Sequence, residues 1–399
     1  MRILHTSDWH LGRSFHREGM LGHQAAYVDH LLSVVEQERV DVVCVSGDVY
    51  DRALPQVDAV RLASETLARL AASRAKVVIT SGNHDSAQRL GFGSDLIDAA
   101  GIFIRTDLAA VGRPVMLPDE HGEVAFYGLP YLEPDTTRAS WGLESRSHQA
   151  ALGEAMRRVR ADLDARHTRS VVMAHAFVTG AEPSDSERDI SVGGVSMVPA
   201  SLFETISYAA LGHLHGRQRI TETVRYSGSP LAYSFSEADH LKGSWLIDLD
   251  ESGLVASEFV EAPVPRRLAR LRGTLDELLS DPSHQAYEDS WLQITLTDRI
   301  RPGQAMERLR RRFPHTLVLG FESTAPVLGA LSRPDPATPR RDIDLVSEFV
   351  AELRGEPAAK AELALLQTAV DACCEDPEVD ALDTSASRSD DDEWLEVLF

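Results

Sequence analysis

The chain has 399 residues, 43% of them hydrophobic and 26% charged, so it is long enough for more than one domain and has a globular composition. No apolar run approaches the roughly 20 residues of a membrane-spanning helix, and the beginning, MRILHTSDWH, lacks the apolar core of a secretory leader. Three cysteines, two of them adjacent, exclude a disulfide scaffold and favour a cytoplasmic protein.

Residues 1–262 alternate short β-branched runs with amphipathic stretches. RILHTS, VDVVCVSGD and KVVITSGN predict strands that end in polar residues or glycine, and the stretches at 24–38 and 57–73 predict helices between them. After Ser170 the strands predominate, in SVVMAH, SYAALGH, TVRYSGS, GSWLIDL and LVASEFVE. This α/β (α+β) pattern predicts a two-sheet β-sandwich flanked by helices, with active groups at the carboxyl ends of strands.

The remaining residues divide into four parts. Residues 263–330 predict a small α/β domain, with the order strand, helix, strand, helix, strand over 265–322. Residues 331–341 are proline-rich and predict a linker, and residues 377–399 predict an acidic, disordered tail. The last five residues, LEVLF, resemble part of a viral protease site left by cloning.

Residues 342–376 predict two amphipathic helices. Their apolar faces consist of Ile343, Val346, Val350 and Leu353 in the first helix, and of Leu363, Leu366, Val370 and Cys373 in the second. Two isolated helices of this length are marginally stable, so we expect them to dock on a partner.

The charge of −22 is unevenly distributed. Residues 335–399 carry 5 basic residues against 18 acidic ones, whereas residues 263–334 carry 11 against 8. The global charge therefore does not exclude a nucleic-acid partner.

Metal-binding residue types follow five of the predicted strands. They occur in SDWH, SGDVYD, SGNHD, MAH and GHLH, and the candidate ligands are Asp8, His10, Asp48, Asn83, His175, His213 and His215. A single strand-end histidine is more often a hydrogen-bonded structural residue than a ligand. Five such motifs in one chain, each after a strand, favour a metal centre.

The spacing of these residues favours two ions. Asp8 and His10, like His213 and His215, are two positions apart, so in an extended backbone each pair points to one side, and the glycines of ALGHLHG would let a phosphate approach. Seven groups are one short of four ligands for each of two ions, and a carboxylate such as Asp48 can bridge them. The mixture of imidazole, carboxylate and amide favours Mn²⁺, Fe or Zn²⁺ over Ca²⁺ or Mg²⁺ alone.

The five motifs resemble those of the calcineurin-like metallophosphoesterases. Within this superfamily the chain is similar to the SbcD-type nuclease subunits, through HTSDWHLG, SGDVYDR, SGNHDS, RDISVGG, ALGHLHGRQ and YSGSPLAYSF. The resemblance covers nearly all of the first 240 residues. It implies a DNA exonuclease and endonuclease with two divalent ions, most simply Mn²⁺, with Mg²⁺ or Fe as alternatives.

The resemblance also implies roles for individual residues. Asp8, His10 and His215 would bind one ion, and Asn83, His175 and His213 the other, with Asp48 shared. His84 would be catalytic, because an imidazole can protonate the leaving oxygen. Asp85 would orient His84 or, as an equal alternative, cap a turn. No catalytic role falls to Asp51.

The substrate and partners are predicted from basic residues and from the same resemblance. Arg13, His16, Arg17 and Arg89 follow the motifs, and Arg308 and Arg311 lie in ERLRRRF, which could face DNA or be a solvated helix face. The resemblance makes residues 263–330 a DNA-capping domain. It makes the helices of 342–376 the binding site of an SbcC ATPase, in a cytoplasmic, nucleoid-associated complex that contains a homodimer of this chain.

Two other functions are compatible with parts of the sequence. A phosphodiesterase or phosphatase for small molecules or proteins could use the same metal core, although the additional domains count against it. An architectural subunit that clamps an ATPase to DNA would not need the complete ligand set. No phosphate-binding loop of the GxxxxGK[ST] type is present, so any use of ATP needs a partner.

Overall fold

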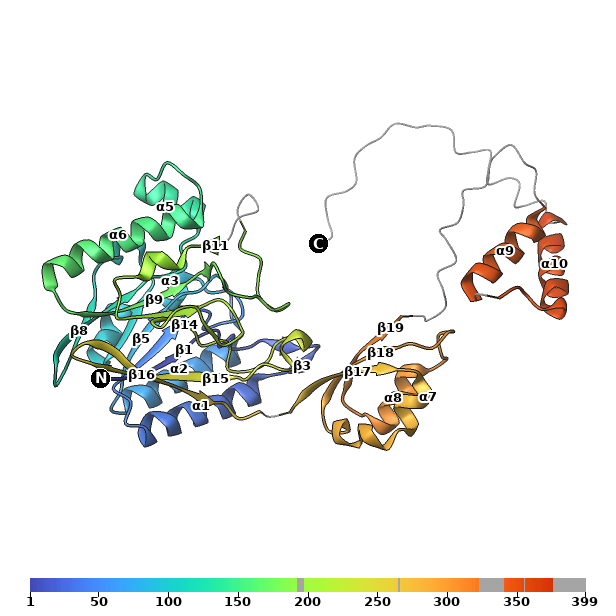
Figure 1. Ribbon diagram of the computed structural model, residues 1–399, viewed down its shortest axis with the longest axis horizontal. Coiled ribbons are helices and arrows are strands. Elements are labelled where there is room, and N and C mark those ends of the chain that lie inside the picture. The colour runs from blue at the N-terminus through green and yellow to red at the C-terminus, as the bar shows by residue number, and fades with distance from the viewer. Residues whose placement is uncertain (192–196, 265, 323–340, 355, 376–399) are drawn as a thin grey trace. The chain divides into compact units, whose positions relative to one another are not determined.

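The computed structural model describes residues 1–191, 197–264, 266–322, 341–354 and 356–375 (Figure 1). The chain forms two compact units. The first consists of Met1–Arg270, Ala286–Gln293 and His315–Val318, and the second of Leu271–Gln285, Ile294–Pro314 and Leu319–Phe399. The predicted linker over 331–341, apart from its last residue, and the tail over 377–399 lie outside the described residues.

The first unit contains two six-stranded sheets. One has the order β16-β15-β1-β4-β5-β6 and the other β13-β14-β12-β9-β8-β7. The first sheet consists of β1 (Arg2–Thr6), β4 (Val42–Ser46), β5 (Lys76–Thr80), β6 (Ile102–Arg105), β15 (Gly243–Asp250) and β16 (Gly253–Glu261). The second consists of β7 (Val115–Asp119), β8 (Gly122–Gly128), β9 (Arg169–His175), β12 (Tyr208–Gly212), β13 (Gln218–Arg219) and β14 (Val224–Tyr226).

Parallel pairing at the centre of each sheet sends several strand ends to one edge. In the first sheet β1, β4, β5 and β6 are parallel, and in the second β8, β9, β12 and β14 are parallel. The outer strands β15 and β16 of the first sheet, and β7 and β13 of the second, pair antiparallel with their neighbours. The carboxyl ends of the parallel strands are therefore available for a site in both sheets.

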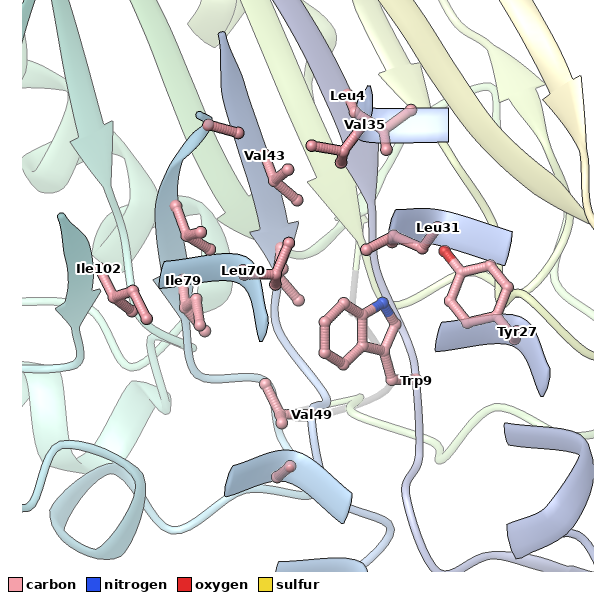
Figure 2. Close-up of a cluster of buried hydrophobic side chains, with 14 of the residues drawn as sticks. Leu4, Trp9, Tyr27, Leu31, Val35, Val43, Val49, Leu70, Ile79 and Ile102 are labelled. Atoms are coloured by element: carbon pink, nitrogen blue, oxygen red, sulfur yellow. The ribbon is translucent and has the colours of Figure 1, made fainter. Parts of the chain in front are cut away.

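The strands β1, β4 and β5 of the first sheet are buried on both faces, which explains their continuous apolar runs. Val42 and Cys44 in β4 pack into a core that also contains Val171 and Met173 of the second sheet. Val43 and Val45 point the other way, into the core beneath α1 (Leu21–Gln37) and α2 (Val57–Ala71), which Figure 2 shows around Trp9. The second sheet packs its outer face against α6 (His148–Arg166).

This architecture confirms the predicted fold class and every strand named from the sequence. The region over 102–166, with β6 to β8, α5 (Pro134–Trp141) and α6, was not resolved into elements by sequence reasoning. The shorter elements are β2 (Ser14–Phe15), β3 (Glu18–Gly19), α3 (Ala87–Leu90), α4 (Ser94–Ile97), β10 (Phe177–Val178) and β11 (Met197–Val198). No helix within the described ranges combines the length and the apolar character that a bilayer crossing needs.

The segment over 268–321 has the predicted alternation of strands and helices. Its elements are β17 (Leu268–Gly273), α7 (Leu275–Ser280), β18 (Trp291–Leu296), α8 (Ala305–Arg312) and β19 (Thr316–Phe321), and the strands form one sheet in the order β17-β18-β19. Thr274 begins α7 with a complete capping box, because its side chain and that of Glu277 satisfy each other's backbone N–H groups.

The two C-terminal helices, α9 (Asp342–Arg354) and α10 (Lys360–Glu375), contact each other. The predicted apolar positions Ile343, Val346, Val350, Leu366 and Val370 are half-buried. Cys373 is exposed and Leu363 is 36% exposed, so these two predicted face positions remain available to a partner. The side chain of Leu353 lies outside the described residues.

Candidate metal centre

The candidate ligands meet where β1, β4, β5, β9 and β12 end. Asp8 and Asp48 each follow the last strand residue by two positions, Asn83 follows β5 by three, and His175 is the last residue of β9. His213 directly follows β12. The sandwich thus brings together residues that are up to 207 positions apart in the sequence, between Asp8 and His215.

The backbone at these residues is not extended, which corrects the geometry expected from the sequence. The φ angles are 53° at Asp8, 45° at His10, 50° at Asp48 and 102° at His213. Left-handed backbone at a non-glycine residue costs about 1–3 kcal/mol and is retained only where the surroundings enforce it. The two-residue spacing therefore reflects tight turns after the strands and not alternation along a strand.

Two glycines permit close approach of the loops, a role different from the predicted approach of phosphate. A Cβ at Gly212 would lie 1.9 Å from the carbonyl oxygen of Ser46, where the ends of β12 and β4 meet. A Cβ at Gly82 would lie 2.1 Å from Oδ1 of Asp48. Both glycines are needed to pack the ligand-bearing loops against one another.

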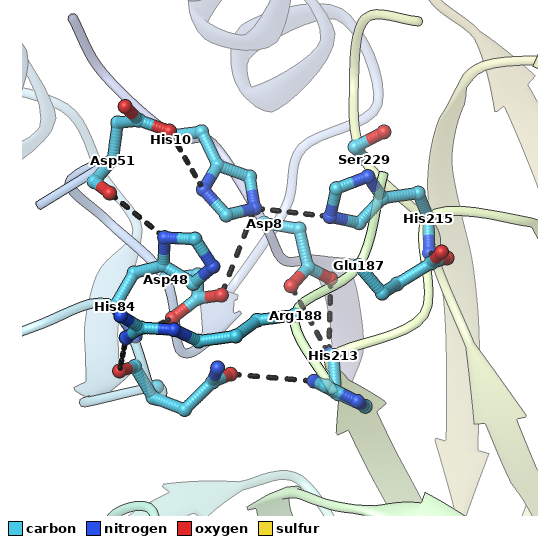
Figure 3. A network of polar contacts seen from close by, with 12 residues as sticks. Asp8, His10, Asp48, Asp51, His84, Glu187, Arg188, His213, His215 and Ser229 are labelled. Atoms are coloured by element: carbon cyan, nitrogen blue, oxygen red, sulfur yellow. Dashed lines mark hydrogen bonds and ion pairs between the residues drawn. The ribbon is translucent and has the colours of Figure 1, made fainter. Parts of the chain in front are cut away.

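The first half of the site consists of Asp8, His10 and His215, all buried. One potential ligand atom from each of them lies within 4.8 Å of the others. Nε2 of His10 is 3.0 Å from Nε2 of His215 (Figure 3). The Asp8 carboxylate accepts hydrogen bonds from the backbone N–H of His213 and from the Ser7 hydroxyl.

The second half contains Asn83, His175 and His213. Oδ1 of Asn83 lies 2.8 Å from Nε2 of His175 and 3.3 Å from Nδ1 of His213. His175 uses its other ring nitrogen, Nδ1, to donate to the carbonyl oxygen of Ser46 at 3.0 Å. If the His175 ring is neutral, its Nε2 is an acceptor, and so is the Oδ1 of Asn83 that it faces. A cation or a proton therefore has to lie between these two atoms.

Asp48 lies between the two halves. Its Oδ2 is 3.4 Å from Nε2 of His175 and 3.6 Å from Nε2 of His10. Its Oδ1 accepts the backbone N–H of His84 at 2.9 Å. A carboxylate that faces one imidazole of each half has the position of a bridging ligand.

The electrostatics of the site fit divalent cations. Within the described part of the chain, no lysine or arginine forms an ion pair with Asp8 or Asp48. Burial raises the pKa of Asp8. At His175 burial works against the charged form, but Asp48 outweighs it and raises the pKa to about 9. Oxygen and imidazole donors that converge without a fixed cation suit Mn²⁺, Fe or Zn²⁺.

His84 contacts the first half of the site without belonging to either predicted ligand set. Its ring centroid is 4.7 Å from that of His10, and its Nδ1 donates to the backbone oxygen of Asp51 at 2.7 Å. Asp51 thus orients His84 through its carbonyl group. A ligand atom of His84 also lies within 4.8 Å of atoms of His10 and Asp48, so geometry alone permits a ligand role.

Asp85 does not orient His84, which corrects one of the two predicted roles. Its carboxylate accepts the backbone N–H groups of Val49, Tyr50 and Gly82 at 2.9–3.1 Å. These bonds tie the loop after β4 to the loop after β5. The alternative role, in which Asp85 caps a turn, describes the contacts that are present.

A pocket of about 510 Å³ adjoins Asn83 and His84, and three arginines line it: Arg13, Arg52 and Arg188. Nη1 of Arg13 is buried and has no hydrogen-bond partner in the described part of the structure. Arg188 donates to the backbone oxygen of Asn83 at 3.4 Å. Of these three, only Arg13 was predicted to contact DNA, although Arg52 and Arg188 belong to the motifs SGDVYDR and RDISVGG.

The other predicted DNA contacts are less closely tied to the site. His16 and Arg17 are exposed, and Arg89 donates to the carbonyl oxygen of Ala53 at 2.8 Å. In α8, Arg308 pairs with Asp276 at 3.2 Å, and Arg311 is exposed. Arg312 bonds the carbonyl oxygens of Leu278 and Asp281, so at least part of this basic helix holds α7 and α8 together.

Comparison with known families agrees with this geometry. Residues 1–217 match the family described as calcineurin-like phosphoesterase, which is more than half of the chain, and the chain therefore belongs to this family of metal-dependent phosphoester hydrolases. Residues 264–344 match the SbcD C-terminal domain, described as the type 5 capsule protein repressor C-terminal domain. The two matches together confirm the resemblance to SbcD-type nucleases.

Several solved structures are similar to the chain. The protein TT1561 of Thermus thermophilus is 13% identical with a TM-score of 0.38, covering 65% of this chain and 98% of that one. A dimetal phosphatase from Danio rerio is 15% identical with a TM-score of 0.40, covering 66% and 99%. The calcineurin-like phosphoesterase YfkN from Bacillus subtilis is 14% identical with a TM-score of 0.34, covering 65% and 88%.

Proposed function

We propose that the chain is a DNA nuclease that cleaves phosphodiester bonds with two divalent cations, Mn²⁺ being the favoured metal. The observation that carries the proposal is a set of seven ligand-type residues beside a pocket lined by Arg13, Arg52 and Arg188. Positive side chains next to a metal centre suit a phosphate backbone. The match to the SbcD C-terminal domain supports DNA over a small-molecule substrate.

The proposed ligand sets follow the two halves of the site. Asp8, His10 and His215 would hold one ion, and Asn83, His175 and His213 the other. Asp48 would bridge them, supported by its distances of 3.4 Å and 3.6 Å to one imidazole of each set. When bound, two such cations neutralise the phosphate, activate the attacking water and stabilise the leaving oxygen.

The remaining chemistry falls to side chains of the pocket. Arg13 and Arg188 would bind the phosphate oxygens next to the scissile bond. His84 has its Nδ1–H engaged by the Asp51 carbonyl, so a protonated ring keeps its Nε2–H for the leaving oxygen. A fixed ring with one free N–H is the geometry that a general acid requires.

The decisive experiment is a nuclease assay with the full-length protein. We expect Mn²⁺-dependent cleavage of linear duplex and hairpin DNA that EDTA abolishes and that the Asp48→Asn variant lacks. Parallel assays with bis-p-nitrophenyl phosphate and p-nitrophenyl phosphate measure the alternative small-molecule activities. Cleavage of these esters without any cleavage of DNA would refute the nuclease proposal.

We further propose that α9 and α10 bind an SbcC-type ATPase. Leu345, Phe349 and Leu365 remain 39%, 56% and 72% exposed although the two helices contact each other. Glutamate at Phe349 and Leu365 should abolish co-purification with the ATPase and leave cleavage of short single-stranded DNA intact. A matched control changes Gln367, an exposed polar residue of α10, to glutamate. Unchanged co-purification of the double variant would contradict this docking surface.

A second copy of the chain is the proposed occupant of another apolar surface. Leu54, Val57, Phe92 and Leu96 are 70–86% exposed, and the Arg89–Ala53 hydrogen bond joins their two segments. A cluster of exposed apolar side chains of this kind is characteristic of a protein–protein contact. Light scattering should give a dimer for the wild type and a monomer for Phe92→Glu combined with Leu96→Glu. A wild-type monomer at micromolar concentration would refute the dimer.

A further inference from the structure

One hydroxyl joins the candidate ligand His215 to a buried carboxylate. Oγ of Ser186 lies 2.5 Å from Nδ1 of His215 and 2.5 Å from Oε1 of Glu237. A serine hydroxyl has one proton to donate, and the carboxylate can only accept it. Ser186 therefore donates to Glu237 and accepts the proton of Nδ1 of His215.

The far end of this chain of hydrogen bonds is anchored inside the protein. Glu237 is 1% exposed and forms an ion pair with Lys242, which is 7% exposed. Lys242 also donates to the backbone oxygen of His215 at 2.8 Å and to Oγ of Ser229 at 3.0 Å. A buried ion pair is tolerated when its remaining polar groups are hydrogen-bonded, as those of Glu237 and Lys242 are. Through these hydrogen bonds the pair also holds His215 in place.

The Ser184–Arg188 segment contacts both halves of the site. Glu187 accepts the backbone N–H of His215 at 2.7 Å, so the segment holds this residue by its main chain as well as by its ring. At its other end, Arg188 donates to the backbone oxygen of Asn83 in the second half. The segment itself lies between β10 and β11 and contributes none of the seven predicted ligands.

We propose that Ser186 and Glu237 are positioning residues that keep the proton of His215 on Nδ1, so that Nε2 is free to bind a metal ion. Nε2 of His215 does face the site, 3.0 Å from Nε2 of His10. Hydrogen-bond partners of ligating histidines fix the tautomer and the ring orientation, and their loss typically weakens metal binding about 10–100-fold. The inference rests on the metal centre of the proposed function but not on its DNA substrate.

The test is metal binding by the full-length Ser186→Ala variant, measured by titration of the metal-free protein with Mn²⁺. We expect the affinity for one of the two ions to fall about 10–100-fold, while the other ion binds nearly as before. Ser191→Ala is the matched control, because the Ser191 hydroxyl bonds only to Asp189 among the contacts described, and it should bind both ions normally. Ser186→Thr keeps the hydroxyl and should restore binding.

A spectroscopic measurement separates positioning from a general loss of structure. In metal-free protein with ¹⁵N-labelled histidine, the nitrogen shifts of His215 should indicate a protonated Nδ1 in the wild type and a tautomer mixture in Ser186→Ala. Glu237→Gln should give the same mixture, and equal thermal unfolding of Ser191→Ala and Ser186→Ala would show that the fold is intact. Wild-type affinity together with an unchanged tautomer in Ser186→Ala would overturn the proposal. This result would leave the nuclease assay unaffected, so the two failures are distinguishable.

Discussion

Carboxylates with little exposure occur at both edges of the sandwich, half-buried at one and fully buried at the other, and their charges are balanced in different ways. At the edge where β1 and β9 begin, Asp119 accepts two hydrogen bonds from Arg169 and pairs with the amino terminus at 3.1 Å. At the opposite edge, Asp8 and Asp48 are 0% and 1% exposed and face imidazoles, backbone N–H groups and a hydroxyl. Among the described residues, only the edge with Asp119 provides fixed cations to these acids, namely Arg169 and the amino terminus.

The difference separates a structural acid from acids that suit a metal. Although burial opposes ionisation at Asp119, the Arg169 hydrogen bond and the amino terminus hold its pKa well below the usual value. At Asp8 burial prevails and raises the pKa, whereas at Asp48 the imidazoles of His175 and His10 outweigh burial and hold the pKa well below its usual value. Burial of an acid without a lysine or arginine partner is typical of functional sites, where stability is given up for activity.

The largest expected effect concerns the acid between the two halves. Asp48→Asn should reduce bound Mn²⁺ from two equivalents to less than one and should abolish phosphodiester cleavage, because the carboxylate that faces both halves is lost. Metal analysis after desalting measures the first effect, and the plasmid-cleavage assay measures the second. Two full equivalents of metal in the variant would show that Asp48 does not bridge the two ions.

His84→Gln should separate catalysis from metal binding. General acid catalysis contributes roughly 10²–10⁴-fold, so kcat should fall by that factor while both ions and DNA remain bound. Single-turnover cleavage and metal analysis of the same sample measure the two properties. Loss of one metal equivalent would instead make His84 a ligand, as its distance from His10 and Asp48 permits.

Metal removal should destabilise the wild type but not the variant that cannot bind metal. A ligand at 100 times its Kd adds about 2.7 kcal/mol to the free energy of unfolding. EDTA should therefore lower the Tm of the wild type and leave that of Asp48→Asn unchanged. Equal sensitivity of both proteins to EDTA would show that the site does not bind the stabilising metal.

The smallest effect is expected at the structural edge. Asp119→Asn should lower the free energy of unfolding by about 1.5–3 kcal/mol at pH 7, the value of hydrogen bonds to charged groups. Because the pKa of Asp119 is depressed in the folded state, this contribution is complete above the unfolded value of about 4 and is lost as the pH falls below it. Urea unfolding should show a smaller difference in the free energy of unfolding between wild type and Asp119→Asn at pH 3.5 than at pH 7. Metal binding by the variant at pH 7 should be unaltered.

The strands of the sandwich and the candidate ligands could be predicted from local sequence patterns. Apolar runs such as those of β4 and β5 are long enough to fix strands locally, and the polar residues directly after them identify strand ends. The alternation over 268–321 was predicted for the same local reason. The sequence over 102–166 carries weaker signals, because β6 and β7 are edge strands that are only partly buried, and α6 presents both buried and exposed residues.

The way in which the ligands are held could not be predicted, because it depends on contacts between distant parts of the chain. The left-handed turns at Asp8 and Asp48 depend on contacts between separate loops, and the Ser186–Glu237 hydrogen bond joins residues 51 positions apart. The sequence left open whether Asp85 orients His84 or caps a turn, and in the structure it bonds the backbone of Val49 and Tyr50. Hydrogen bonds between loops depend on which strand ends meet in space, and no local pattern of residues encodes that meeting.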